Sequence, residues 1–126
     1  MSIMQESVRI LIITKNHAYE RLYHDFFAQS GYIVYPCDAV SNAMLQLLMY
    51  PQISLILLDT DFVNVSIKKF LQTLKRHAEW REKKVILFDS ADKGDLLKVI
   101  FTPNGIVYSA SVDPMDIRKL IQQILR

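Results

Sequence analysis

Four side chains able to do chemistry stand directly after apolar runs of the sequence: Thr14, Lys15, Asp59 and Ser90. A carboxylate near a hydroxyl or an ammonium group can accept a hydrogen bond or form an ion pair. Simpler roles exist for each of them. Asp59 could accept backbone N–H groups at a strand end, Ser90 could cap a helix, and Lys15 could lie in solvent. The choice depends on the elements that position these residues.

The segments around these residues alternate between two hydrophobic patterns. Short apolar runs predict five strands, at residues 8–13, 32–35, 53–58, 85–88 and 106–109. Apolar residues at helical spacing predict five helices, at residues 17–30, 41–49, 67–74, 95–101 and 113–125. We expect Gly31 to end the first helix, Pro36 to stop the second strand, Ser41 or Asp38 to cap the second helix, and Asp113 to cap the last.

Strands that alternate with helices predict βαβ units and therefore a parallel sheet. The 126 residues form one predicted domain, residues 1–126, of the α/β doubly wound class. Its five strands take the order 2-1-3-4-5, the flavodoxin-like arrangement, with five helices distributed over both faces. Sites in such folds lie beyond the carboxyl ends of the strands, where the four residues above are placed.

The composition excludes several classes of protein. Cys37 is the sole cysteine, which rules out a disulfide framework and a multi-cysteine metal site. The three glycines stand apart, so no glycine-rich loop cradles a nucleotide. No apolar run approaches the roughly 20 residues that span a bilayer. We expect a cytoplasmic domain with no membrane segment, with His17 and His24 as surface residues and Cys37 in a loop or the core.

Short motifs occur in a fixed order along the chain. Gly31-Tyr32 follows the first predicted helix, Leu57-Leu58-Asp59 ends the third strand, Ser90-Ala91 follows the fourth, and residues 110–117 lead into the last helix. In this order and spacing the chain resembles the receiver domain of two-component response regulators over nearly its whole length. The resemblance implies that Asp59 is equivalent to the phosphoacceptor and Ser90 to the residue that reads the phosphoryl oxygen.

The chain also departs from the family at the positions that carry its chemistry. Thr14 and Lys15 replace the acidic pair that holds Mg²⁺ together with the acceptor, and Ala110 replaces the invariant lysine. Mg²⁺ needs oxygen ligands, and phosphoryl transfer needs cations to neutralise developing charge. We therefore predict a pseudo-receiver that signals through protein–protein interaction. It should have no catalytic residue, no cofactor and weak or absent Mg²⁺ binding. Lys15 either pairs with Asp59 in the cation site or lies in solvent.

Two other functions remain open at this point. The first is a phosphoacceptor receiver that uses Asp59 with a nonstandard ion site, to which Asp61 could contribute. The second is a small nucleic-acid-binding regulator acting through residues 68–84, although nucleic acid is the less favoured partner. That segment carries seven basic and two acidic residues, a local net charge of +5, and Trp80 as an aromatic able to stack on bases. An acidic protein is an alternative partner for it.

Apolar residues near the end of the chain exceed what one buried stripe requires. They are Val99, Ile100, Phe101 and Met115. This excess predicts a face for a protein partner or for a homodimer.

Overall fold

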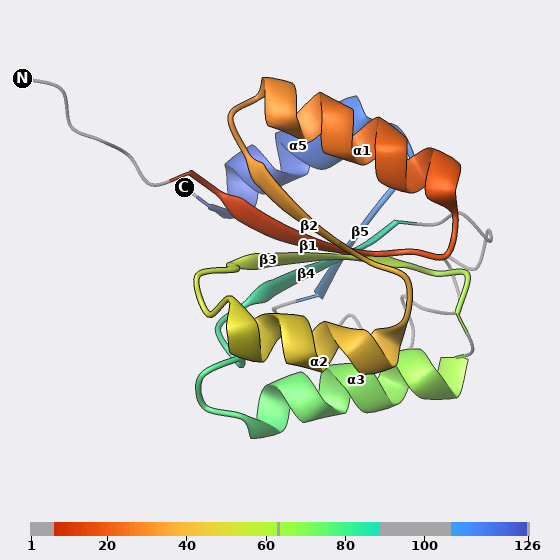
Figure 1. The fold of residues 1–126 in the computed structure, drawn as a ribbon. Helices are drawn as coiled ribbons and strands as arrows, with labels where there is room; N and C mark the ends of the chain where they lie inside the picture. Colours follow the sequence, from red (N-terminus) through yellow and green to blue (C-terminus); the bar gives the residue numbers. More distant parts are fainter. Residues whose placement is uncertain (1–6, 63, 89–106, 126) are drawn as a thin grey trace, which may run out of the picture.

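The computed structural model describes residues 7–62, 64–88 and 107–125. They form one parallel sheet with the strand order β2-β1-β3-β4-β5, which confirms the predicted order (Figure 1). The strands are β1 (Arg9–Ile13), β2 (Ile33–Cys37), β3 (Leu55–Asp59), β4 (Lys84–Phe88) and β5 (Val107–Ala110).

Helices cover both faces of the sheet, as predicted for a doubly wound domain. Helices α1 and α5 lie on one face, and α2 and α3 lie on the other (Figure 1). Their bounds are α1 (His17–Gln29), α2 (Val40–Met49), α3 (Asn64–Arg76) and α5 (Pro114–Ile124). The helix predicted over residues 95–101 lies outside the described residues, so the expected total of five helices stays a prediction.

Side chains of the central strands alternate between two cores. Ile10 and Ile12 of β1 and Leu55 and Leu57 of β3 pack in the core beneath α1 and α5. Their neighbours in sequence pack in the opposite core beneath α2 and α3, which is formed by Leu11, Ile13, Ile56 and Leu58 together with residues of both helices. Burial on both faces explains why these strands read as continuous apolar runs.

Local signals fix the ends of two helices. The Asn16 side chain accepts hydrogen bonds from the backbone N–H groups of Ala18 and Tyr19 at the start of α1. Gly31 has a φ of +82° just after α1, which confirms its predicted role because glycine adopts this conformation without strain. Asp113 caps α5 as predicted, since its carboxylate accepts from the Met115 N–H.

Two expectations about the second βα unit were wrong. Strand β2 runs through Pro36 to Cys37, because β2 is an edge strand and proline there leaves no ladder donor missing. Helix α2 begins after Ala39 with no side-chain cap, so neither Ser41 nor Asp38 performs that role.

Candidate functional site at the ends of β1 and β3

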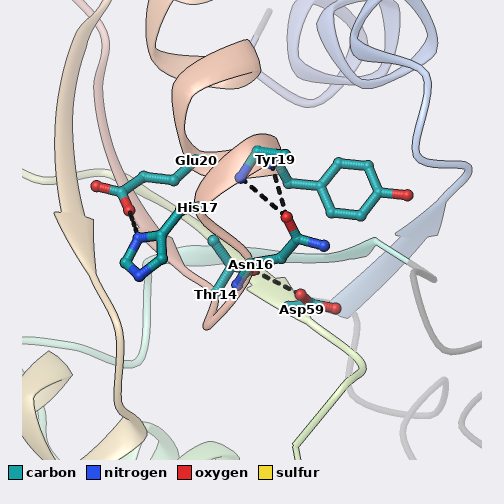
Figure 2. Close-up of polar contacts among 7 residues, drawn as sticks. Thr14, Asn16, His17, Tyr19, Glu20 and Asp59 are labelled. Atoms are coloured by element: carbon teal, nitrogen blue, oxygen red, sulfur yellow. Dashed lines mark hydrogen bonds and ion pairs between the residues drawn. The ribbon is translucent and has the colours of Figure 1, made fainter.

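A buried hydrogen bond joins the ends of the two central strands. Thr14 follows β1 and Asp59 ends β3, and each is 1% exposed. The Thr14 hydroxyl donates to Asp59 Oδ2 over 2.6 Å, and Figure 2 shows the two side chains meeting beneath the start of α1. Thr14 Oγ1 also accepts the Asn16 N–H at 3.0 Å. One hydroxyl therefore connects the Asp59 carboxylate to the turn that starts α1.

Strand alternation places these two side chains on the same side of the sheet. Ile12 pairs with Leu57 in the β1–β3 ladder, and both belong to the core beneath α1 and α5. Thr14 and Asp59 lie two residues further along their strands, so the alternation returns them to that side. Parallel strands in register then bring the hydroxyl and the carboxylate together.

The second oxygen of Asp59 is bound to the loop that follows it. Asp59 Oδ1 accepts the backbone N–H of Asp61 at 3.0 Å, a short-range turn typical of aspartate. The Thr60 N–H donates to the Phe88 carbonyl at 3.1 Å, which ties the same loop to the end of β4. The Asp61 side chain itself is exposed. Backbone groups thus hold part of the Asp59 carboxylate, as the simpler reading of the sequence anticipated.

Lys15 lies at the surface and does not pair with Asp59. Lys15 and Asp59 are both among the described residues, and they form no ion pair with each other. The Lys15 ammonium lies 5.1 Å from the ring centroid of Phe62. Lys15 follows Thr14 by one residue, so it projects to the opposite side of the sheet, where Phe62 joins the core beneath α2 and α3. Of the two readings of Lys15, the pair with Asp59 was therefore wrong and the exposed position is confirmed. The neutral Thr14 hydroxyl contacts Asp59 instead.

A second polar contact holds the loop between β5 and α5 near this site. The Tyr23 hydroxyl of α1 donates to the Val112 carbonyl over 2.6 Å. Its ring meets Phe88 edge-on, with 5.1 Å between ring centroids. Burial raises the pKa of the Tyr23 phenol well above its ordinary value. The Val112 carbonyl supplies the partner that a buried tyrosine hydroxyl generally needs.

Ala110 ends β5 opposite Phe88 in the β4–β5 ladder and packs against the core beneath α1 and α5. Its methyl group brings no cation to this edge of the sheet. Beyond it, the Ser111 hydroxyl donates to Asp116 at 2.8 Å. Ser90 lies outside the described residues, so its expected role beside Asp59 stays a prediction.

The basic segment at residues 68–84 is not one continuous charged patch. Lys83 is 8% exposed, and its ammonium donates to the carbonyls of Pro51 and Ile53. Trp80 is 5% exposed and belongs to the core beneath α2 and α3, so its ring is covered rather than open to a nucleic-acid base. The exposed cations of helix α3 remain, at Lys68, Lys69, Lys75 and Arg76.

The remaining candidate residues are mostly surface positions. Met115 is 43% exposed at the start of α5, whereas its predicted neighbours Val99, Ile100 and Phe101 lie outside the described residues. His17 and His24 are exposed beside acidic residues, as expected. Cys37 is buried, and burial raises the pKa of its thiol, which fits a packing role.

Within the described ranges, no three or more His, Cys, Asp or Glu side chains gather as a metal-binding group would. None of the helices seen there combines the length and the apolar character needed to cross a membrane.

No protein-family model and no curated protein matches the sequence. Solved structures do match. A chemotaxis response regulator of Vibrio cholerae is 11% identical with a TM-score of 0.80. The match covers 94% of this chain and 99% of the Vibrio cholerae chain. A response regulator receiver protein from Pseudomonas putida is 16% identical with a TM-score of 0.70, covering 96% and 98%. A response regulator protein from Burkholderia multivorans is 19% identical with a TM-score of 0.71, covering 96% and 97%. The chain therefore has the receiver fold of response regulators.

Proposed function

We propose that this chain is a receiver-type signalling domain that acts through protein–protein contact without Mg²⁺-dependent phosphorylation of Asp59. The observation that carries the proposal is the 2.6 Å hydrogen bond from Thr14 to Asp59. At the edge of the sheet where a receiver holds its carboxylates around a cation, this chain places a neutral hydroxyl against Asp59, the one buried aspartate among the residues that the structure describes.

The donor atoms at this edge do not fit Mg²⁺. This ion prefers nearly octahedral oxygen ligation, with carboxylates supplying charge. Thr14 Oγ1 already donates to Asp59 and accepts from Asn16, so coordination through it would break both hydrogen bonds. Asp59 Oδ1 accepts from the Asp61 backbone. A cation would have to displace these contacts, and among the described residues it would gain one buried carboxylate, that of Asp59, in return.

Phosphoryl transfer to Asp59 would also gain no compensating positive charge from the described positions 15 and 110. An attacking carboxylate and a transferred phosphoryl group are both negative, and such reactions depend on cations at the developing charge. Ala110 contributes no ammonium, and the Lys15 ammonium lies over Phe62. We therefore expect transfer from small phosphodonors to be negligible, and the chain to have no enzymatic activity of its own.

Hydrogen bonds at the strand ends support a role as a binding domain whose conformation does not depend on phosphorylation. Thr14 and Asp59 join β1 to β3, and Tyr23 joins α1 to the loop before α5. These contacts hold together the edge of the sheet that would otherwise respond to a phosphoryl group. In this proposal the partner recognises a surface that is present without phosphorylation.

The proposal is tested by titrating the protein with Mg²⁺ and beryllofluoride, a phosphoryl mimic, while amide NMR shifts are recorded. We expect no saturable shift at Asp59, Thr60 or Asp61 at millimolar Mg²⁺. A Thr14→Asp variant places a second carboxylate beside Asp59 and should show saturable Mg²⁺-dependent shifts at the same amides. Saturable shifts in the unmodified chain would instead support the phosphoacceptor alternative and contradict the proposal.

A further inference from the structure

Helix α2 exposes large apolar side chains on its outer surface. Leu45, Leu48 and Met49 are 56%, 64% and 57% exposed, whereas Leu47 on the inner side is 1% exposed. Their spacing places the three on adjoining turns of one face, which we name the α2 apolar face. Ala43 and Leu47 fill the inner side of the helix.

Helix α3 lies beside α2 on the same face of the sheet and is strongly basic (Figure 1). Its exposed cations are Lys68, Lys69, Lys75 and Arg76, which we name the α3 basic face. Residues 39–58 contain no charged side chain, and residues 62–78 contain no acidic one. An uncharged apolar face is therefore bordered on one side by a helix whose charged residues are all Lys or Arg.

We propose that the α2 apolar face and the α3 basic face together bind an amphipathic helix of a partner protein. The partner helix carries an apolar stripe over α2 and a row of Asp or Glu side chains along the edge that faces α3. Leucine and methionine suit this role because methionine adapts its shape to an apolar partner surface. Charge complementarity along α3 fixes which way the helix lies. This inference rests on the proposed function only in taking protein contact as the chain's mode of action.

The opposite border of α2 supports this orientation. A cleft there is lined by Glu20 and Asp38, by His17 beside Glu20, and by uncharged residues that include Asn42 and Leu45, with no Lys or Arg among them. Acidic side chains on that border would repel an acidic edge of the partner, whereas α3 attracts it. The two borders thus differ in sign.

The same charges argue against two other occupants. A second copy that placed α2 against α2 about a twofold axis would bring two α3 basic faces near each other, and like charges would oppose the contact. An anionic membrane would attract α3 but repel Glu20 and Asp38 on the other border of α2. Peripheral membrane helices usually carry their cations on their own polar face, whereas α2 carries none.

The test is a selection of helical peptides on the intact chain. A displayed library with a fixed leucine stripe and edge positions varied among Glu, Lys and Ser is panned, and the enriched peptide is then synthesised for binding measurements. We expect enrichment of Glu along one edge and affinity that falls with added salt. Leu48→Asp should weaken binding by at least about tenfold. Leu22→Asp, on the 45% exposed Leu22 of α1, is the matched control and should leave binding unchanged.

A charge exchange tests the predicted orientation. A Lys68→Glu, Lys69→Glu variant should lose the Glu-edged peptide and gain its Lys-edged counterpart, with each variant's fold checked by circular dichroism. Enrichment without acidic edges, or binding indifferent to Leu48→Asp, would overturn the inference. So would Leu48-dependent association with phosphatidylserine vesicles, or Leu48-dependent dimerisation in sedimentation. None of these outcomes depends on Mg²⁺. Phosphorylation of Asp59 would therefore overturn the proposed function without affecting the inference about this binding surface.

Discussion

The Thr14 hydroxyl lies 2.6 Å from Asp59 Oδ2, and both side chains are almost fully buried where β1 and β3 end. This contact supplies a hydrogen bond to the carboxylate without supplying a charge. It also connects Asp59 to the first turn of α1, because Thr14 accepts the Asn16 N–H. The aspartate that a receiver would use as its acceptor is therefore held within the framework of this chain.

Removing the Thr14 hydroxyl should destabilise the protein while preserving its shape. Thr14→Val keeps the branched side chain but leaves Asp59 Oδ2 and the Asn16 N–H without this partner. We expect the free energy of unfolding to fall by about 1–3 kcal/mol, measured by urea denaturation. Thr14→Ser should retain most of the stability.

Thr73 offers a matched control, because its hydroxyl donates to the Lys69 carbonyl on the exposed side of α3. Thr73→Val should change stability by less than about 0.5 kcal/mol. Equal losses for the two valine variants would show that the buried Thr14 contact has no special role.

Tyr23 should make stability decline at alkaline pH. Burial raises the pKa of its phenol, so the unfolded chain ionises from its ordinary pKa of 10.0 while the folded chain stays neutral. The stabilisation is complete below that pH and is lost as pH rises above it. Tyr23→Phe should lower the free energy of unfolding by about 1 kcal/mol at neutral pH and reduce its alkaline decline. An unchanged alkaline slope in denaturation between pH 9 and 11 (about one unit on each side of that value) would contradict this account.

Lys83 should affect stability in the opposite direction with pH. Burial lowers the pKa of its ammonium below the ordinary 10.5, so the unfolded chain binds the proton more tightly in the window between the two values. Its contribution to stability therefore rises with pH through that window. Lys83→Met should remove this rise and, near neutral pH, cost about 1–2 kcal/mol because the Pro51 and Ile53 carbonyls lose a donor.

The exposed Lys68 provides the comparison for Lys83. Lys68→Met should leave the free energy of unfolding within about 0.5 kcal/mol of the unmodified protein at each pH. A Lys68 variant as unstable as the Lys83 variant would indicate that loss of positive charge in general, rather than the buried contacts, controls stability.

Trp80 provides a direct probe of the nucleic-acid alternative. It is the sole tryptophan and is 5% exposed, so its fluorescence should show the blue-shifted maximum of a buried indole. Because the ring is packed in the core, we expect single-stranded oligonucleotides to leave this emission unchanged at low salt. Saturable quenching that weakens as salt is added would instead favour binding through residues 68–84.

Much of the framework could be predicted from the sequence because the local signals agree with one another. Apolar runs separated by helical stripes led to the strand order, and Gly31 and Asp113 marked helix ends where the structure has them. Pro36 misled because whether proline interrupts a strand depends on its position in the sheet. An edge position is a property of the assembled sheet rather than of the residues around Pro36.

The site was predicted less well, for a reason that lies in the strands themselves. The opposite charges of Lys15 and Asp59 suggested an ion pair, but charge type does not determine the direction of a side chain. The alternation of side chains along β1 and β3 determines that direction. Thr14 lies two residues after Ile12, and Asp59 two residues after Leu57, so both point to the same side of the sheet as those core residues. That signal was available in the sequence and would have favoured Thr14. The Tyr23–Val112 contact, by contrast, depends on how α1 and the β5–α5 loop pack together.

The central claim is that Asp59 does not accept a phosphoryl group, and intact mass spectrometry tests it most directly. The unmodified chain is incubated with acetyl phosphate and Mg²⁺ beside an Asp59→Asn variant, and both masses are measured without delay under cold conditions. The account predicts that the unmodified chain keeps its mass, as the variant does. A gain of one phosphoryl group in the unmodified chain that is absent from Asp59→Asn would contradict it.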